Sequence, residues 1–248
     1  MLRYRGICGL LLLGATLACA EAPLLPVEVV AQYPHDAAAF TQGLVIDKGE
    51  LFEGTGLNGQ STLRRVDLET GAVLQQQKLG ERYFGEGITI LGDKIYQLTW
   101  QTHVGFVYSR DDFQQLSSFY LPGEGWGLTH DGKELIVSDG TAMLRFLDPV
   151  TLKETHRVAV NEDGVPLTKL NELEYINGEV WANVWYTDYI VRIDPVTGKV
   201  LSKLDLSSLH PQSASDDVLN GIAWDADAKR LFVTGKLWPH LYEIRVRE

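Results

Sequence analysis

The chain has 248 residues, of which 45% are hydrophobic, and its formal net charge at pH 7 is −11. This composition is typical of a globular protein with enough apolar residues for a substantial core. The acidic excess comes without a cluster of Lys or Arg, so it disfavours nucleic acid as a partner, because phosphate backbones would be repelled.

The first twenty residues have the pattern of a secretory leader. Arg3 and Arg5 form a short basic region, and an almost unbroken apolar run follows over 9–17. Ala18-Cys19-Ala20 then offers the small residues that a signal peptidase accepts. The apolar run is too short to span a bilayer, and no later segment is long enough either. We therefore predict a signal peptide over 1–20 and an exported protein, periplasmic or secreted.

Cleavage after Ala20 would remove both cysteines of the chain. Lipid attachment at Cys19 is the alternative, but Thr16 stands where a lipoprotein leader usually has Leu, so we favour a soluble product. Cys8 and Cys19 are the only two cysteines, and removing 20 of the 248 residues leaves 228 with no thiol. We therefore expect no cysteine nucleophile and no disulfide. Residues 21–248 are expected to form a single domain, because this length is normal for one all-β propeller.

The mature sequence is organised as five repeats. Short alternating apolar runs are broken by Gly, Asn and Asp, as in antiparallel sheet. Each repeat has an apolar strand, a tight polar turn and a second strand rich in aromatic or β-branched residues. The repeats begin at Gly43, Gly87, Gly127, Leu173 and Gly221, a spacing of 40 to 48 residues. That spacing suits one four-stranded propeller blade per repeat.

These repeats predict an all-β fold, a five-bladed β-propeller with four-stranded antiparallel blades. The fifth repeat stops at Leu241–Val246, one strand short of a full blade. Pro26–Tyr33 has strand character but no repeat of its own. We expect this N-terminal strand to complete the last blade and to close the ring, so that neither chain end leaves an open sheet edge. A closed ring without thiols is compatible with a monomer.

Unusual residues stand where such a ring would bring them together. First strands surround the axis, so the residues that precede them, and those that end the second strands, meet in one funnel. The five entrances are 40–43 (FTQG), 84–87 (FGEG), 123–127 (GEGWG), 169–172 (KLNE) and 217–221 (DVLNG). Second strands end near Trp100, Trp185 and Lys236. Together these residues predict a pocket with a polar floor and aromatic walls.

Each of these residues also has a structural explanation. Tryptophans in propellers often wedge between blades, Glu86 between two glycines can cap a turn, and Lys236 can be a solvated loop residue. Their coincidence at equivalent places in several repeats favours function instead.

Seven blocks of the sequence resemble the plant and bacterial glutaminyl-peptide cyclotransferase family, over nearly all of the mature chain. The blocks are FTQGL (40–44), YFGEGIT (83–89), YQLTW (96–100), LNELEY (170–175), VWANVW (180–185), LNGIAWD (219–225) and VTGKLWP (233–239). The resemblance implies a five-bladed propeller that acts on peptides or proteins with N-terminal glutamine. It would close that glutamine into pyroglutamate and release ammonia.

The resemblance also implies roles for individual residues. Glu86 takes the role of the catalytic carboxyl. The matching polar pocket residues are Gln42, Asn171 and Lys236, and the matching aromatic walls are Phe40, Phe84, Trp100, Trp126 and Trp185. If Glu86 does not act, Glu124 and Glu172 at other blade entrances are the next candidates.

These residue types suit the reaction. The α-amine attacks its own γ-carboxamide carbon, so little positional entropy remains to be supplied. One carboxyl between the two nitrogens can accept the amine's proton and return it to the leaving ammonia. Desolvation against Trp and Phe would raise its pKa towards the working range. Lys236, Asn171 or Gln42 could stabilise the oxyanion, and the sequence leaves this choice open.

Other functions have weaker support. The stretch 54–59 formally matches a dinucleotide fingerprint, but a strand-like segment follows it, so we interpret it as a hairpin loop. The six histidines are scattered singly, which disfavours a catalytic zinc site. Asp216-Asp217 could hold a structural calcium, although a solvated turn is the simpler account, and we expect no cofactor. The alternatives left open are a propeller lactonase, generally six-bladed and metal-dependent, and a non-enzymatic ligand- or protein-binding propeller.

Overall fold

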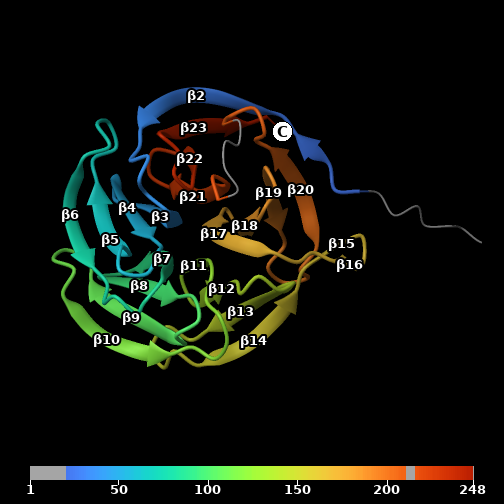
Figure 1. Ribbon diagram of the computed structural model, residues 1–248. Coiled ribbons are helices and arrows are strands. Elements are labelled where there is room, and N and C mark those ends of the chain that lie inside the picture. Colours follow the sequence, from blue (N-terminus) through green and yellow to red (C-terminus); the bar gives the residue numbers. More distant parts are fainter. Residues whose placement is uncertain (1–20, 211–215, 248) are drawn as a thin grey trace, which may run out of the picture.

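Five β-sheets surround a central axis in the computed structural model, which describes residues 21–210 and 216–247 (Figure 1). Each sheet has its first strand at the axis and its last at the rim. This arrangement confirms the predicted all-β, five-bladed propeller. The leader predicted over 1–20 lies outside the described residues. Within the described part of the chain, no helix is long and apolar enough to cross a membrane.

Blades 1 to 3 are each built from four consecutive antiparallel strands. Blade 1 contains β3 (Thr41–Asp47), β4 (Glu50–Thr55), β5 (Thr62–Val66) and β6 (Val73–Lys78). Blade 2 contains β7 (Gly85–Leu91), β8 (Lys94–Thr99), β9 (Val104–Ser109) and β10 (Gln115–Tyr120). Blade 3 contains β11 (Leu128–His130), β12 (Leu135–Val137), β13 (Met143–Leu147) and β14 (Glu154–Ala159). The glycine-rich stretch 54–59 ends β4 and leads into β5, so it is a hairpin connection, as expected.

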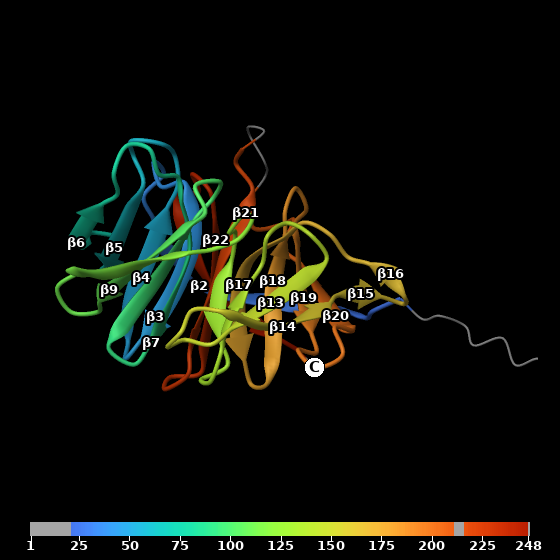
Figure 2. The same cartoon turned by 90° about the horizontal axis from the view of Figure 1, so that it is seen from below.

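Blades 4 and 5 contain the departures from simple chain order. Blade 4 contains β17 (Leu170–Ile176), β18 (Glu179–Val184), β19 (Tyr189–Ile193) and β20 (Val200–Asp205). The short strand β1 (Leu24–Leu25) pairs in parallel with β20. A small hairpin of β15 (Asn161–Glu162) and β16 (Val165–Pro166) projects from the ring near blade 4 (Figure 2). Neither β1 nor this hairpin was predicted from the sequence.

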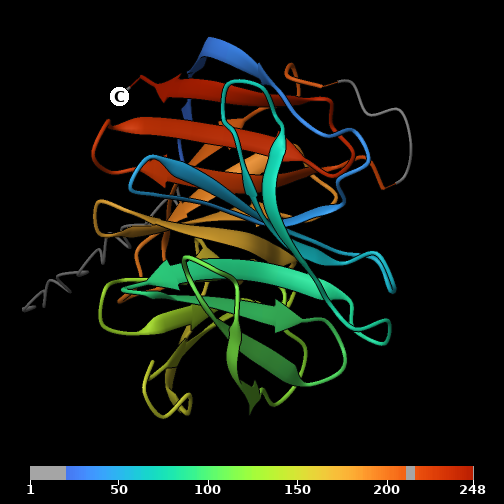
Figure 3. The same ribbon diagram turned by 90° about the vertical axis from the view of Figure 1, so that its left-hand side faces the viewer.

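Blade 5 is completed by the N-terminal part of the chain. It contains β21 (Leu219–Asp225), β22 (Arg230–Gly235), β23 (His240–Val246) and β2 (Val27–Pro34). β2 runs antiparallel to β23 along the edge of the molecule, from Val27 opposite Val246 to Pro34 opposite His240 (Figure 3). The predicted closure of the ring by an N-terminal strand is therefore confirmed.

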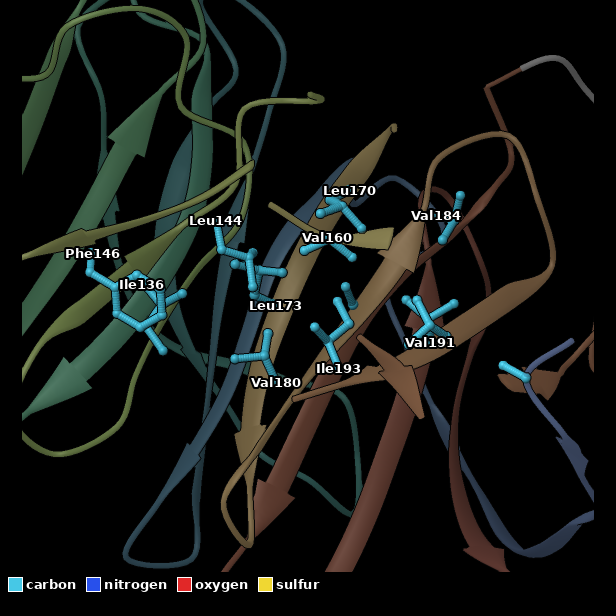
Figure 4. Packing of buried hydrophobic residues seen from close by; sticks show 13 residues of the cluster. Ile136, Leu144, Phe146, Val160, Leu170, Leu173, Val180, Val184, Val191 and Ile193 are labelled. Carbon is cyan, nitrogen blue, oxygen red and sulfur yellow. The ribbon is translucent and has the colours of Figure 1, made fainter. Parts of the chain in front are cut away.

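The apolar core is divided into five clusters, one between each pair of neighbouring blades. Successive residues of a strand point to opposite faces, so each blade supplies two clusters. Ile95 of β8 packs towards blade 1, while Tyr96 packs towards blade 3. Figure 4 shows the cluster between blades 3 and 4, where Leu144 lies near Leu173. This division explains why strands inside the ring are apolar on both faces.

Inner strands approach closely at the axis because glycines stand there. A Cβ atom added to Gly43 would lie 2.5 Å from the backbone nitrogen of Ile88. One added to Gly87 would lie 2.6 Å from the backbone nitrogen of Leu128. Side chains at these positions would therefore force the blades apart.

Blade 4 has Glu172 at the position where the other inner strands have glycine. Its Oε1 accepts a hydrogen bond from the Leu44 amide of β3 at 3.2 Å, and its Oε2 accepts one from the Ile222 amide of β21 at 2.9 Å. Two residues on, Glu174 accepts from the Trp224 amide at 2.9 Å and from the Thr129 hydroxyl at 3.3 Å. These carboxyls connect blade 4 to blades 1, 3 and 5.

Burial raises the pKa of Glu174 to about 8, above its ordinary value of 4.5. Burial and the neighbouring Glu174 also raise the pKa of Glu172 well above that value. A carboxyl whose pKa is raised in the folded protein costs no stability while the pH lies below its pKa in the unfolded chain. As the pH rises from about 4.5 to about 8, the unfolded chain ionises first and the protein loses stability.

We predict that Glu174→Gln flattens this pH dependence. Glutamine stays neutral, and it can still accept from the Trp224 amide and donate to Thr129. In thermal melts at pH 5 and pH 8, the melting temperature of the unmodified protein should fall more than that of the variant. Glu69→Gln, at an exposed turn, is the control and should follow the unmodified protein. An equal fall in both proteins would contradict the assignment.

Candidate active site

A pocket of about 280 Å³ lies at the axial end where the inner strands begin. All nine residues assigned to the pocket from the sequence line it, together with Leu57, which was not predicted, and Asp216, which was considered only for a calcium site. The lining residues are Phe40, Gln42, Leu57, Phe84, Glu86, Trp100, Trp126, Asn171, Trp185, Asp216 and Lys236. The structure thus brings together side chains from all five blades.

Irregular pairing at the start of the inner strands directs the polar side chains. Four of the five inner strands shift register at the same place relative to their second strands. The shifts lie between 41 and 43, 85 and 88, 170 and 173, and 219 and 222. Such bulges re-aim side chains that would otherwise follow the strand alternation. Gln42, Glu86 and Asn171 lie in these bulges and reach the pocket.

The fourth bulge residue, Asn220, supports the site from behind. Its Nδ2 donates to the Thr41 carbonyl at 2.9 Å and to Gln42 Oε1 at 3.1 Å. Because the Gln42 oxygen is engaged, its amide nitrogen is left to donate elsewhere. Asn220 belongs to the LNGIAWD block, but its hydrogen bond to Gln42 could not be predicted from the sequence.

Glu86 is a buried carboxyl with no compensating ion pair among the described residues. Its exposed fraction is 4%. Burial raises its pKa well above the ordinary value, the positive charge of Lys236 opposes this, and the negative charge of Glu124 adds to it. The raised pKa favours the protonated carboxyl over the carboxylate. A perturbed carboxyl in a concave pocket is a candidate acid–base group.

Lys236 is buried opposite the aromatic wall. Its exposed fraction is 5%, and burial lowers its pKa while Glu86 and Asp216 oppose the shift. Nζ lies 4.7 Å from the ring centroid of Phe40 and 6.0 Å from that of Trp185. These distances allow a cation–π attraction that partly replaces lost water.

The pocket walls are two series of edge-to-face rings. On one side Phe84 packs against Phe40 at 6.0 Å between centroids and against Trp100 at 5.6 Å. On the other side Trp126 packs against Trp185 at 5.2 Å and 88°. Such contacts hold aromatic walls in place without filling the space between them.

The wedge explanation holds for tryptophans outside the pocket. Trp181 and Trp238 are buried in the cluster between blades 4 and 5, and Trp224 packs against it. Propeller tryptophans therefore have both roles in this chain.

Glu124 fixes both walls rather than lining the pocket. One oxygen, Oε2, accepts the indole N–H of Trp100 at 2.7 Å and that of Trp126 at 2.9 Å, and Oε1 accepts from Gln101 at 3.1 Å. Burial works to raise the pKa of Glu124, but the bonds from Trp126, Gln101 and Trp100 hold it below the ordinary value. Glu124 is therefore an anchored anion.

The solvated turn expected at Asp216-Asp217 is wrong for Asp217. This residue is only 5% exposed, and its Oδ2 lies 3.0 Å from His210 Nε2. Asp216 is exposed and lines the pocket. Among the residues that the structure describes, no three His, Cys, Asp or Glu side chains gather in a way that could hold a metal ion.

We predict that Glu124→Gln loosens the two indoles and leaves the fold intact. Glutamine can keep one oxygen between the two indoles, but it loses the negative charge that strengthens both hydrogen bonds, and its amide nitrogen would face the Gln101 amide nitrogen, a donor against a donor. The intrinsic tryptophan fluorescence should shift in wavelength or intensity, while the melting temperature stays within a few degrees. Glu81→Gln, at an exposed position, should change neither property. Unchanged fluorescence in Glu124→Gln would contradict the anchoring role.

Comparison with known proteins agrees with the arrangement of the site. Residues 7–246 match the glutamine cyclotransferase family. The chain is 49% identical over 229 residues to a glutaminyl-peptide cyclotransferase of Arabidopsis thaliana, covering 90% of this chain and 72% of the relative. It superposes on the crystal structure of Myxococcus xanthus glutaminyl cyclase with a TM-score of 0.86 and 37% identity, covering 92% of this chain and 100% of the other. The chain therefore belongs to the glutamine cyclotransferase family.

Proposed function

We propose that this protein converts the N-terminal glutamine of peptides or proteins into pyroglutamate with release of ammonia. The observation that carries the proposal is the Glu86 carboxyl, buried in an aromatic-walled pocket that raises its pKa. Membership of the family supports the same reaction. Glu172 and Glu174 are also buried carboxyls, but they accept amide hydrogen bonds from other blades, whereas Glu86 lines the pocket and accepts no hydrogen bond from another described side chain or amide.

A neutral carboxyl can serve both nitrogens in one step. The substrate's α-amine, with a free pKa of about 7.7–8.0, attacks in its neutral form. As the new C–N bond forms, the carbonyl oxygen of Glu86 accepts a proton from the attacking nitrogen. The hydroxyl of Glu86 donates its proton to the departing nitrogen, which leaves as ammonia. Glu86 ends the reaction as a carboxyl again, so no net proton is taken up or released.

The developing oxyanion needs a donor, and Gln42 has an amide that is already oriented. Asn220 engages Gln42 Oε1, so Gln42 Nε2 can donate to the substrate's γ-carbonyl oxygen. Asn171 and Lys236, on the same pocket surface, are further donors. One such donor is typically worth about 3 kcal/mol of transition-state stabilisation.

We predict that Glu86→Gln lowers kcat for ammonia release from a glutamine-initiated peptide by at least about 100-fold. Glutamine keeps the shape and hydrogen bonding of the side chain but cannot exchange the proton. KM should change little, because binding depends on the walls and the amide donors. The Glu81→Gln protein is the control. Near-normal turnover by Glu86→Gln would show that this carboxyl is not the proton shuttle.

We also propose that turnover uses side-chain groups alone and needs no metal ion. The carboxyl and amide groups of the pocket already meet the needs for proton transfer and oxyanion stabilisation. Extended dialysis against a chelator should therefore leave kcat unchanged. A loss of activity that one divalent ion restores, with an unchanged melting curve, would defeat this proposal.

We further propose that residues 21–248 are the mature single catalytic domain of an exported, periplasmic or secreted monomer. The support is the leader pattern over 1–20 and its Ala18-Cys19-Ala20 cleavage site. The intact mass of the protein recovered after export distinguishes plain cleavage from lipid attachment at Cys19.

A further inference from the structure

The peptide substrate must extend beyond the pocket, and this inference rests on the proposed function. If the N-terminal glutamine occupies the pocket of about 280 Å³, its carbonyl carbon leads into the next residue. That second residue then lies on the rim, against whatever side chains continue the pocket walls outwards. Specificity beyond glutamine is set by those rim residues.

Tyr186 continues one wall onto the rim. Its ring stacks on that of the pocket residue Trp185, with centroids 4.2 Å apart and an interplanar angle of 28°. The side chain is 49% exposed, so the ring remains accessible to a ligand. Its backbone has a φ of 63°, a left-handed conformation that tyrosine rarely adopts. An exposed ring held by a strained backbone next to a binding pocket points to a functional role.

Lys169 provides a positive charge at the same place. Its carbonyl accepts the Trp185 amide at 2.9 Å, so the two loops are joined by a backbone hydrogen bond. Its Nζ lies 5.8 Å from the ring centroid of Tyr186. The side chain is exposed and forms no ion pair with any other described residue. This ammonium therefore gives the rim beside Tyr186 a local positive charge in a chain with a formal charge of −11.

We propose that Tyr186 and Lys169 form the binding surface for the second residue of the substrate. The Tyr186 ring contacts the side chain of that residue, so a large second residue is favoured over glycine. The Lys169 ammonium attracts an acidic second residue and repels a basic one. Both are specificity-determining residues for the peptide, and neither takes part in the proton transfer at Glu86.

The test compares kcat/KM for the C-terminal amides of Gln-Gly, Gln-Phe, Gln-Glu and Gln-Lys, each divided by the value for glutamine amide. Dividing by glutamine amide removes any effect transmitted through Trp185 to the pocket. The unmodified protein should prefer Gln-Phe over Gln-Gly by about 2- to 10-fold, as expected of an aromatic contact. It should prefer Gln-Glu over Gln-Lys by about 1.5- to 5-fold, as expected of an exposed ion pair.

Variants assign each preference to its residue. Tyr186→Asn removes the ring while accepting the left-handed backbone, so the Gln-Phe preference should fall to about one, whereas Tyr186→Phe should keep it. Lys169→Gln should abolish the preference for Gln-Glu, and Lys133→Gln, at an exposed turn, should not.

Two outcomes would overturn the proposal. One is an unmodified protein that does not distinguish the four peptides, or that prefers Gln-Lys, as pairing with Asp216 would cause. The other is a set of normalised ratios that stays unchanged in Tyr186→Asn and Lys169→Gln. If no substrate, glutamine amide included, releases ammonia, the proposed function itself fails, and the two failures are thereby distinguished.

Discussion

The close approach of the five inner strands at one axis is the constraint on which the rest of the structure depends. Gly43 and Gly87 leave room for nothing but backbone there, and Glu172 binds the amides of β3 and β21 across the axis. The strands cannot slide without breaking these contacts. Because the strands are held at fixed positions around the axis, their bulges direct Gln42, Glu86 and neighbouring side chains into the same small volume. The site is a consequence of how the ring closes.

Two buried glutamates, Glu53 and Glu86, show how the neighbouring groups decide the charge of a carboxyl. Burial acts to raise the pKa of Glu53, but His35 at 3.0 Å and Arg64 at 3.0 Å lower it to about 2, with help from the Thr41 hydroxyl. Glu86 has no ion pair of this kind among the described residues, and the charge of Lys236 lowers its pKa less than burial raises it. Because desolvation favours the neutral form unless a charge opposes it, the same side chain is an anion in one place and an acid in the other.

The ring could be predicted from the sequence because each blade repeats a strand–turn–strand pattern. The strands are apolar on both faces, since each blade packs against two neighbours. The pocket residues were predictable for the same reason, since equivalent positions in a ring converge. Leu57 was missed because an apolar residue in a glycine-rich loop, here with a φ of 78°, has no local signal. Asn220 and Glu124 act through partners far away in the chain, and β1 is two residues long. Tertiary contacts, not sequence patterns, determine such features.

The proposed mechanism requires Glu86 to be a neutral acid in a desolvated pocket. The most direct measurement is a pH titration of its carboxyl by difference infrared or carbon NMR spectroscopy, with the Glu86→Gln protein subtracted. The prediction is a carboxyl that remains protonated through neutral pH and ionises only well above the usual range for glutamate. A Glu86 signal that ionises near the ordinary value of 4.5 would contradict the account.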